Sequence, residues 1–132
     1  MKKILFVCVE NAGRSQMAEG FFRKYLPKGF EPISAGTKPS DKVNPIVIQV
    51  MNEVGIDISK QIPKSISNDM IKDSRVVNMG CIDKKSCPAL FLESVDDWNI
   101  TDPKDKSIEQ VREIRDQIEN KVKEFVSNLE IN

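Results

Sequence analysis

The fold is decided by a stretch near the N-terminus that reads Lys3-Ile4-Leu5-Phe6-Val7-Cys8-Val9-Glu10-Asn11-Ala12-Gly13-Arg14-Ser15. Its first half is continuously apolar after Lys3, which is typical of a strand buried on both faces of a parallel sheet. Its second half is polar and contains a glycine, and Ser15 opens a helical pattern that runs from Gln16 to about Tyr25. The stretch therefore predicts a strand, a short loop and a helix in immediate succession.

The same order of elements recurs along the chain. Residues 31–35 predict a second strand, and a helix begins at Pro45 and stops at Gly55. Ser67 caps a short predicted helix, and residues 75–79 predict a third strand. Strands that alternate with helices predict an α/β fold with a three-layer open sheet of four parallel strands and helices on both faces.

The last third of the chain is less regular at first. Residues 89–92 predict a short edge strand, residues 94–106 are predicted to form a loop, and Trp98 within them is expected to be a packing anchor. A long amphipathic helix follows, whose apolar face consists of Ile108, Val111, Ile114 or Arg115, Ile118, Val122, Phe125 and Leu129.

Composition narrows the class of protein. With 132 residues and 39% hydrophobic content, the chain is long enough for one packed core, so we expect a single domain over residues 1–132. Its 20 Lys and Arg balance 20 Asp and Glu, which points to neither nucleic acid nor an anionic membrane as partner. No segment has the roughly 18 apolar residues of a membrane span or the pattern of a signal peptide. We expect a cytoplasmic monomer.

Cysteine and histidine counts direct attention to thiol chemistry. Three cysteines are an odd number, which favours reactive thiols in a reducing compartment over a secreted disulfide scaffold. The chain has no histidine, which excludes Ser-His and Cys-His catalysis and histidine-based metal sites.

The loop after the first strand has the pattern of an oxyanion site. Cys8 ends the strand, five residues follow, and Arg14 and Ser15 lead into the helix. Such a turn can aim successive backbone N–H groups inward, and the helix N-terminus adds partial positive charge. Arg14 can hold two oxygens of a tetrahedral anion, and the same positive field is expected to lower the pKa of Cys8. The predicted anion-binding residues are Val9, Glu10, Asn11, Ala12, Gly13 and Arg14.

Details of this loop lead to further expectations. Asn11 and Gly13 tolerate positive φ, which a tight turn needs, and Ser15 either caps the helix or donates to the thiolate. A lone Cys8 is more commonly a small buried hydrophobe and a lone Arg14 a surface charge. The combination favours catalysis, and a Walker-type nucleotide loop is excluded because the required Gly-Lys-Ser/Thr is missing.

The other two cysteines, Cys81 and Cys87, follow the third predicted strand and precede Pro88. The carboxyl ends of parallel strands share one edge of the sheet, so these thiols are expected near the first loop. A flexible segment can bring two cysteines within the Cα distance of about 7 Å that a disulfide needs. Incidental thiols and half of a zinc site are the alternatives, and the pair together favours a redox relay.

Taken together, these motifs closely resemble the thioredoxin-coupled arsenate reductases, which share the low-molecular-weight phosphatase fold. The resemblance rests on Cys8 to Ser15 with Gln16-Met17-Ala18-Glu19-Gly20, and continues in Ser34-Ala35-Gly36, Val43-Asn44-Pro45, Ile56-Asp57-Ile58-Ser59, Cys87-Pro88 and Asp102-Pro103. It spans nearly the whole chain.

The resemblance implies a mechanism and its partners. Cys8 would attack arsenate with a proton supplied by Asp102, and a Cys8-Cys81-Cys87 disulfide relay would release arsenite and be reset by thioredoxin or a small thiol. Catalytic residues would thus be Cys8, Arg14, Ser15, Cys81, Cys87 and Asp102. Without the resemblance, Asp102 is nearly as well explained as a turn residue before Pro103.

The resemblance also implies an optional potassium ion at Asn11, Glu19 and Ser34, and it implies that no cofactor is required. The alternative for Glu19 is an ordinary solvated residue on the helix surface.

The chain departs from many phosphatases of this fold in having Glu10 for glycine and Gly13 for cysteine. Glu10 is expected to point outward, because a carboxylate facing the anion opposes binding. Two other functions fit these residues. The main alternative is a phosphotyrosine or phosphomonoester phosphatase that uses Cys8, Arg14 and Asp102. The second alternative is a non-catalytic redox sensor or anion-binding module.

Overall fold

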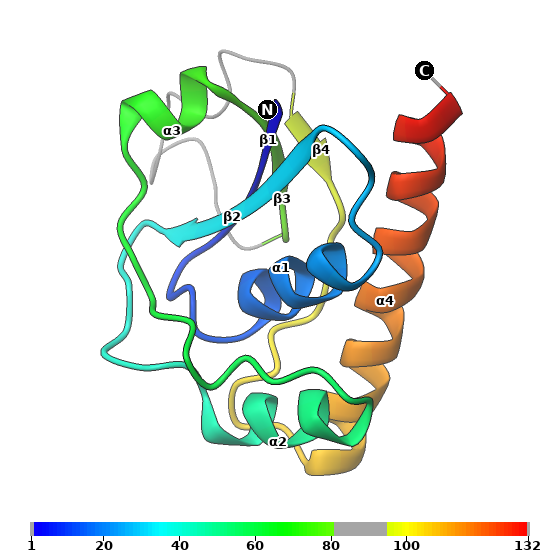
Figure 1. Ribbon diagram of the computed structural model, residues 1–132. Helices are drawn as coiled ribbons and strands as arrows, with labels where there is room; N and C mark the ends of the chain where they lie inside the picture. Colours follow the sequence, from blue (N-terminus) through cyan, green and yellow to red (C-terminus); the bar gives the residue numbers. More distant parts are fainter. Residues whose placement is uncertain (1, 81–94, 132) are drawn as a thin grey trace.

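The structure is a computed structural model and describes residues 2–80 and 95–131. The described residues form one sheet whose strands β1 (Lys2–Cys8), β2 (Phe30–Gly36), β3 (Ser74–Asn78) and β4 (Val95–Asp97) are all parallel. Their order across the sheet is β2-β1-β3-β4, as seen in Figure 1. The prediction of four parallel strands is confirmed.

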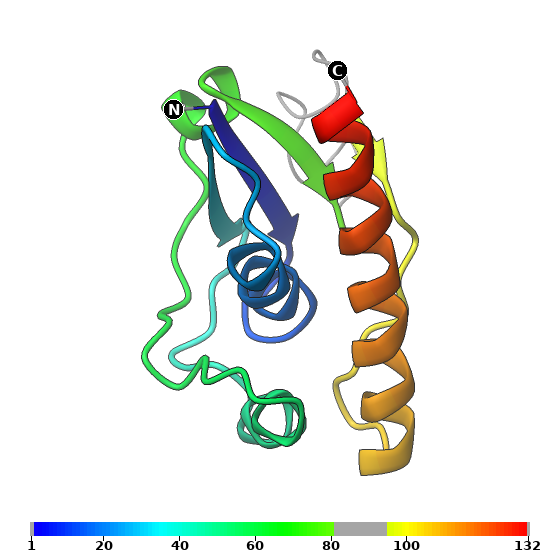
Figure 2. The same ribbon diagram turned by 45° about the vertical axis from the view of Figure 1, so that its right-hand side comes forward.

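Four helices surround this sheet in the described part of the chain. They are α1 (Arg14–Lys24), α2 (Pro45–Glu53), α3 (Asn68–Lys72) and α4 (Ile108–Ile131). Local signals fit the ends of two of them: Pro45 is the first residue of α2, and the Ser67 hydroxyl accepts a hydrogen bond from the Met70 N–H at the start of α3. Figure 2 shows α4 on one side of the sheet and α3 on the other.

Alternation along β1 explains why both faces of the sheet are covered. Ile4, Phe6 and Cys8 belong to the larger core cluster, together with residues of α1, α2 and α4. Leu5 and Val7 point to the opposite face and join a smaller cluster with residues of β2, β3 and α3. A strand that is apolar at every position is stable only when two layers bury it, which yields the three-layer arrangement.

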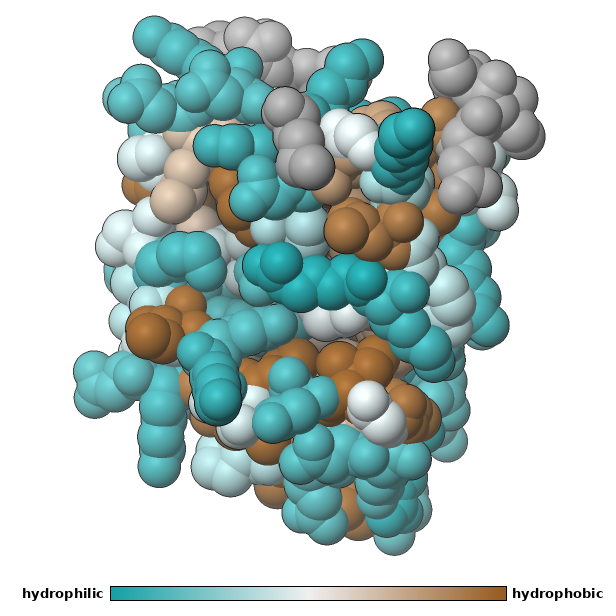
Figure 3. Space-filling view, in the orientation of Figure 1, coloured by the Kyte–Doolittle hydropathy of each residue, from teal (hydrophilic) through white to brown (hydrophobic). Residues whose placement is uncertain are grey.

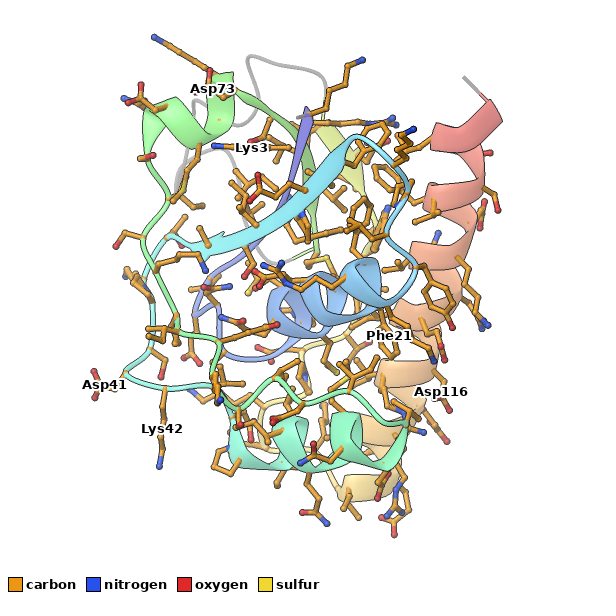
Figure 4. All side chains as sticks on the ribbon, in the orientation of Figure 1. Lys3, Phe21, Asp41, Lys42, Asp73 and Asp116 are labelled. Atoms are coloured by element: carbon orange, nitrogen blue, oxygen red, sulfur yellow. The ribbon has the colours of Figure 1, made fainter. Side chains whose placement is uncertain are left out.

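The long helix α4 closes the larger face. Its buried positions include Val111, Ile118, Val122 and Phe125, in agreement with the apolar face predicted from the sequence. The Trp98 ring is 9% exposed and its centroid lies 5.9 Å from that of Phe125, so the expected packing role of Trp98 is confirmed. Figure 4 labels Phe21, whose buried side chain extends from α1 on the side of α4.

One expectation for the irregular region is wrong. Residues 94–106 were expected to be loop throughout, but Val95–Asp97 form β4, which pairs with β3 from Val76 to Asn78. Three residues that include two aspartates carry almost no strand pattern, and β4 forms because backbone groups at the edge of β3 pair with it. The edge strand predicted at residues 89–92, like Cys81 and Cys87, lies outside the described residues.

The topology singles out one end of β1. After β1 the chain crosses to β2 on one side, and later returns to β3 on the other side of β1. Ligands of open α/β sheets bind beyond the carboxyl ends of the strands at such a reversal point, which here is Cys8.

Among the described helices, none combines the length and the apolar character needed to cross a bilayer. The face drawn in Figure 3 is mostly hydrophilic, with hydrophobic side chains gathered in its lower half near α2.

Candidate active site

The loop between β1 and α1 directs its backbone N–H groups inward. Four of its carbonyl groups are engaged from outside: those of Val9, Glu10 and Ala12 accept from the β2–α2 segment at 2.8 to 2.9 Å, and that of Asn11 accepts from Gln16 Nε2 at 2.8 Å. In a planar trans peptide the N–H points opposite to the C=O, so the N–H groups of residues 10–13 face the centre of the loop. The Asn11 N–H points to this centre, since its nitrogen lies 3.2 Å from Cys8 Sγ.

The Cys8 thiol lies at the centre of this ring of amides. Its Sγ is 2.9 Å from the Ser15 Oγ, and that oxygen accepts a hydrogen bond from Asn11 Nδ2 at 2.7 Å. A Cys8 thiolate has no proton to give, so in that state the Ser15 hydroxyl is the donor to sulfur. Together with the Asn11 N–H it stabilises the thiolate.

The expectations for the loop backbone are met in part. Asn11 has a φ of 52°, as predicted for a tight turn. Gly13 does not have positive φ: its φ is −136°, and a Cβ there would lie 2.9 Å from Pro103 Cγ. The position therefore has little space for a side chain. Helix α1 begins at Arg14 with Gly13 at its cap position, so Ser15 does not cap the helix.

Arg14 is held at the side of the loop by the segment that follows β4. It is only 7% exposed; its Nη1 donates to the Ile100 carbonyl at 2.6 Å, and its Nη2 lies 3.5 Å from Asp102 Oδ2. A buried guanidinium that is fixed at one nitrogen presents its remaining donors in a set direction. The Ile100 carbonyl is a feature that sequence reasoning missed, since any residue supplies one.

Asp102 stands at the mouth of the site with its side chain 59% exposed. Its Oδ1 accepts from the Lys104 N–H at 2.9 Å, while Oδ2 faces Arg14. The residue is thus a turn aspartate and a neighbour of the anion loop at once, so the two readings of the sequence are compatible. Figure 1 shows the yellow segment after β4 passing beside the blue loop after β1.

A cavity of about 550 Å³ opens above the thiol. Its described lining combines the anion loop, the β2–α2 segment and the Asp102 loop: Cys8, Val9, Glu10, Ala12, Gly13, Arg14, Ser40, Lys42, Asn44, Pro45, Asp102, Pro103 and Lys104. Lys42 and Lys104 add positive charge at the rim, and Figure 4 shows Lys42 projecting from the loop that precedes α2. Neither lysine was singled out from the sequence; for Lys104 the available signal is its position two residues after Asp102.

The Glu10 carboxylate is turned toward the rim. Its Oε1 accepts from Lys104 Nζ at 2.9 Å, and this hydrogen bond raises the pKa of Lys104 above its ordinary value. Glu10 is 43% exposed, so the pair is in contact with solvent. Its charge is directed to a lysine and not to the anion seat, which fits the expectation that it points away from the anion.

The residues expected to hold potassium lie together but are already bonded. Glu19 is only 4% exposed, so it is not a solvated residue. Its Oε1 accepts from Ser34 at 2.8 Å and lies 4.0 Å from Lys64 Nζ, and its Oε2 pairs with Arg23. The Asn11 Oδ1 accepts from the Lys64 N–H at 3.0 Å. The positive charges of Arg23 and Lys64 beside Glu19 would compete with a cation for these oxygens. Among the described residues, no group of three or more His, Cys, Asp or Glu is arranged to hold a metal.

The fold and the site define a class of phosphatase-fold proteins with a cysteine-centred anion loop. The model of the family called low molecular weight phosphotyrosine protein phosphatase matches residues 3–132, and the chain belongs to this family.

Several of its relatives are arsenate reductases by name. A Halobacterium salinarum protein that is provisionally named an arsenate reductase is 43% identical over 128 residues, covering 91% of this chain and 87% of the relative. A "Glutaredoxin arsenate reductase" of Synechocystis is 37% identical over 131 residues, covering 98% and 99%. The solved structure titled "An arsenate reductase in the phosphate binding state" is 36% identical and superposes with a TM-score of 0.85, covering 97% of this chain and 98% of that one.

Proposed function

We propose that the protein is an arsenate reductase that acts as one domain over residues 1–132. The observation that carries the proposal is the Cys8 thiol seated in a ring of inward-facing amides beside a buried Arg14. Such a seat binds a tetrahedral oxyanion and places a nucleophile against its central atom. The names of the relatives above and the phosphate-bound neighbour support arsenate as that anion.

The first step forms a bond between Cys8 and arsenic. The Cys8 thiolate attacks arsenate in the loop, and one arsenate oxygen leaves as water after Asp102 supplies a proton. Asp102 suits this role because it lines the same cavity as Cys8 and its Oδ2 lies 3.5 Å from Arg14 Nη2. Arsenic remains in its oxidised state at this stage, because only ligands have been exchanged.

The second step transfers two electrons. The Cys81 thiolate attacks the Cys8 sulfur, the Cys8–Cys81 disulfide forms, and the arsenic–sulfur bond breaks with its electron pair remaining on arsenic, which leaves as arsenite. Cys87 then attacks Cys81, which frees the Cys8 thiolate and forms the Cys81–Cys87 disulfide. Both later cysteines lie outside the described residues. Support comes from β3, where Asn78 is the register partner of Val7, so the chain leaves β3 next to Cys8.

A dithiol reductase would reset the enzyme by reducing the Cys81–Cys87 disulfide. We propose thioredoxin, as expected from the sequence, and the glutaredoxin in the name of the Synechocystis relative makes the glutathione–glutaredoxin system the alternative. We further propose a cytoplasmic monomer, since a relay of this kind needs reduced thiols and no second subunit. Potassium has no step in this proposal, because Asn11, Glu19 and Ser34 are already bonded.

Hydrolysis of a phosphomonoester is the second candidate, since arsenate and phosphate share charge and shape. It would use Cys8, Arg14 and Asp102 and neither of the later cysteines. The described part of the cavity lining supports a small inorganic anion, because Ser40, Lys42 and Asn44 offer polar donors to its oxygens.

The proposal is tested by counting arsenite released per molecule of reduced protein, with thioredoxin, with glutaredoxin and glutathione, and with no reductant, beside a phosphatase assay. Cys87→Ser is expected to release about one equivalent and stop, and Cys8→Ser none. Multiple turnovers by Cys81→Ser would refute the relay. Phosphatase turnover without any arsenite would establish the second candidate in its place.

A further inference from the structure

The mouth of the anion site is bridged by an ion pair between two segments that are far apart in sequence. Lys104 Nζ lies 2.9 Å from Glu10 Oε1, where Glu10 belongs to the anion loop and Lys104 to the segment after β4. Both side chains line the cavity, and they are 59% and 43% exposed. A carboxylate on an anion-binding loop opposes anions unless a cation compensates for it, and Lys104 is the cation placed to do so.

The same lysine is tied to Asp102. The backbone N–H of Lys104 donates to Asp102 Oδ1 at 2.9 Å, which leaves Oδ2 directed at Arg14. The orientation of the Asp102 carboxyl group therefore depends on where the Lys104 backbone lies. Since Asp102 is itself 59% exposed, few other contacts determine that orientation.

A third contact lies between these two. Pro103 packs directly on Gly13 of the anion loop, where an added Cβ would come within 2.9 Å of Pro103 Cγ. Residues 102–104 thus touch the anion loop at Arg14, Gly13 and Glu10, with the Glu10–Lys104 pair at the outer end.

We propose that Glu10 and Lys104 form a clasp that positions Asp102 over the anion seat, so that both are positioning residues of the reaction. This inference rests on the proposed function, since it gives Asp102 the proton-donating role. The clasp has two separable effects. Each partner helps to hold the Asp102 loop, and each contributes its own charge to the electrostatic potential at the seat.

These two effects predict a pattern that a merely structural role would not produce. Glu10→Gln removes a negative charge, so phosphate is expected to bind about two- to fivefold tighter, while Lys104→Gln is expected to weaken it by about the same factor. Both variants loosen Asp102, so both are expected to lower the rate of arsenite release at saturating arsenate, by about three- to tenfold. Phosphate affinity should thus rise in Glu10→Gln and fall in Lys104→Gln, whereas the rate of arsenite release should fall in both variants.

The experiment measures phosphate affinity by calorimetry and the first turnover of the fully reduced, full-length protein without any reductant. Exchanging the charges in the Glu10→Lys/Lys104→Glu double variant is expected to restore the rate to within about twofold of wild type, which neither single reversal achieves. Asp105→Asn is the matched control: it removes one negative charge, as Glu10→Gln does, but from the residue next to Lys104, and asparagine tolerates the φ of 61° found there.

If the first-turnover rate is unchanged in both Glu10→Gln and Lys104→Gln, the clasp is overturned. It is also overturned if the Glu10→Lys/Lys104→Glu double variant is no faster than the two single charge reversals. An Asp105→Asn variant that reproduces the effects of Glu10→Gln would overturn it too, since net charge would then explain them. If wild-type protein releases no arsenite, the proposed function fails. The same variants are then compared by hydrolysis of p-nitrophenyl phosphate, which needs the same seat and the same aspartate.

Discussion

The Ser15 hydroxyl lies 2.9 Å from the Cys8 sulfur, and the Asn11 side-chain amide donates to that hydroxyl at 2.7 Å. The asparagine thereby holds the serine oxygen, and the serine proton can be donated to a Cys8 thiolate. The nucleophile and the first turn of α1 are in this way joined by one short hydrogen-bonded chain inside the protein.

Removing this donor should make the thiol less reactive. In Ser15→Ala the thiolate loses the hydroxyl as a hydrogen-bond donor, so we expect alkylation of Cys8 by iodoacetamide at neutral pH to slow by about tenfold. Mass spectrometry of Cys8 over time measures this. Ser127→Ala, at an exposed position of α4, is the control, and equal rates in the two variants would contradict the assignment.

Gly13 is predicted to be required for space. In Gly13→Ala the new Cβ would meet Pro103 Cγ at 2.9 Å, so the Asp102 loop should move away and the first turnover should slow by about tenfold. Truncating the ring in a Gly13→Ala/Pro103→Ala double variant tests the cause: a double variant no faster than Gly13→Ala would show that this contact is not the reason.

Gly36 is predicted to be required for close backbone packing. A Cβ there would lie 2.4 Å from the Val9 carbonyl oxygen and 3.0 Å from the Asn11 nitrogen, and neither atom can move without moving the anion loop. Gly36→Ala should lower the melting temperature by about 4 to 12 °C and abolish phosphate binding. Gly29→Asn is the control, because nothing lies near its Cβ position and asparagine tolerates its φ of 88°. Normal phosphate affinity in Gly36→Ala would contradict the prediction.

The ion pair between α2 and α4 should make stability depend on pH. Arg112 binds Glu53 through two nitrogens at 2.7 and 3.0 Å, and these hydrogen bonds, assisted by Arg115, hold the pKa of Glu53 below its ordinary value. A lowered pKa in the folded state means that the stabilisation is full above the ordinary glutamate value and is lost as the pH falls through the folded one.

The urea midpoint of Glu53→Gln should therefore lie below that of wild type at pH 7. The gap between the two midpoints should close as the pH falls from about 5 to about 3. Glu124→Gln, at an exposed position on α4, should show no such closing gap. A gap for Glu53→Gln that persists unchanged in acid would count against the pair.

Replacing potassium by sodium should have no effect. The Glu19 carboxylate is met by Ser34, Arg23 and Lys64, which leaves no oxygen set for a cation. We expect the same melting temperature and the same first-turnover rate in potassium and sodium chloride at equal ionic strength. A specific gain with potassium would show that the ion displaces the Lys64 amine.

Sequence reasoning identified the anion loop because its chemistry is local. A thiol at a strand end, a five-residue turn and an arginine before a helix determine their own geometry within a few residues. The sequence did not predict β4, whose three residues become a strand only by pairing with β3. It also predicted positive φ at Gly13, where the structure instead shows Pro103 close to the position of a Cβ.

The amino-acid sequence by itself determined the order of the first three strands and of the helices, the two buried faces of β1 and the identity of the cysteine-centred loop, because periodicity and short-range spacing encode these features. Only the tertiary structure decided what surrounds that loop. The Ile100 carbonyl on Arg14, the Lys104 amine on Glu10 and the Lys64 amine beside Glu19 come from segments more than forty residues away. Such contacts depend on how the layers pack, and no local pattern records them.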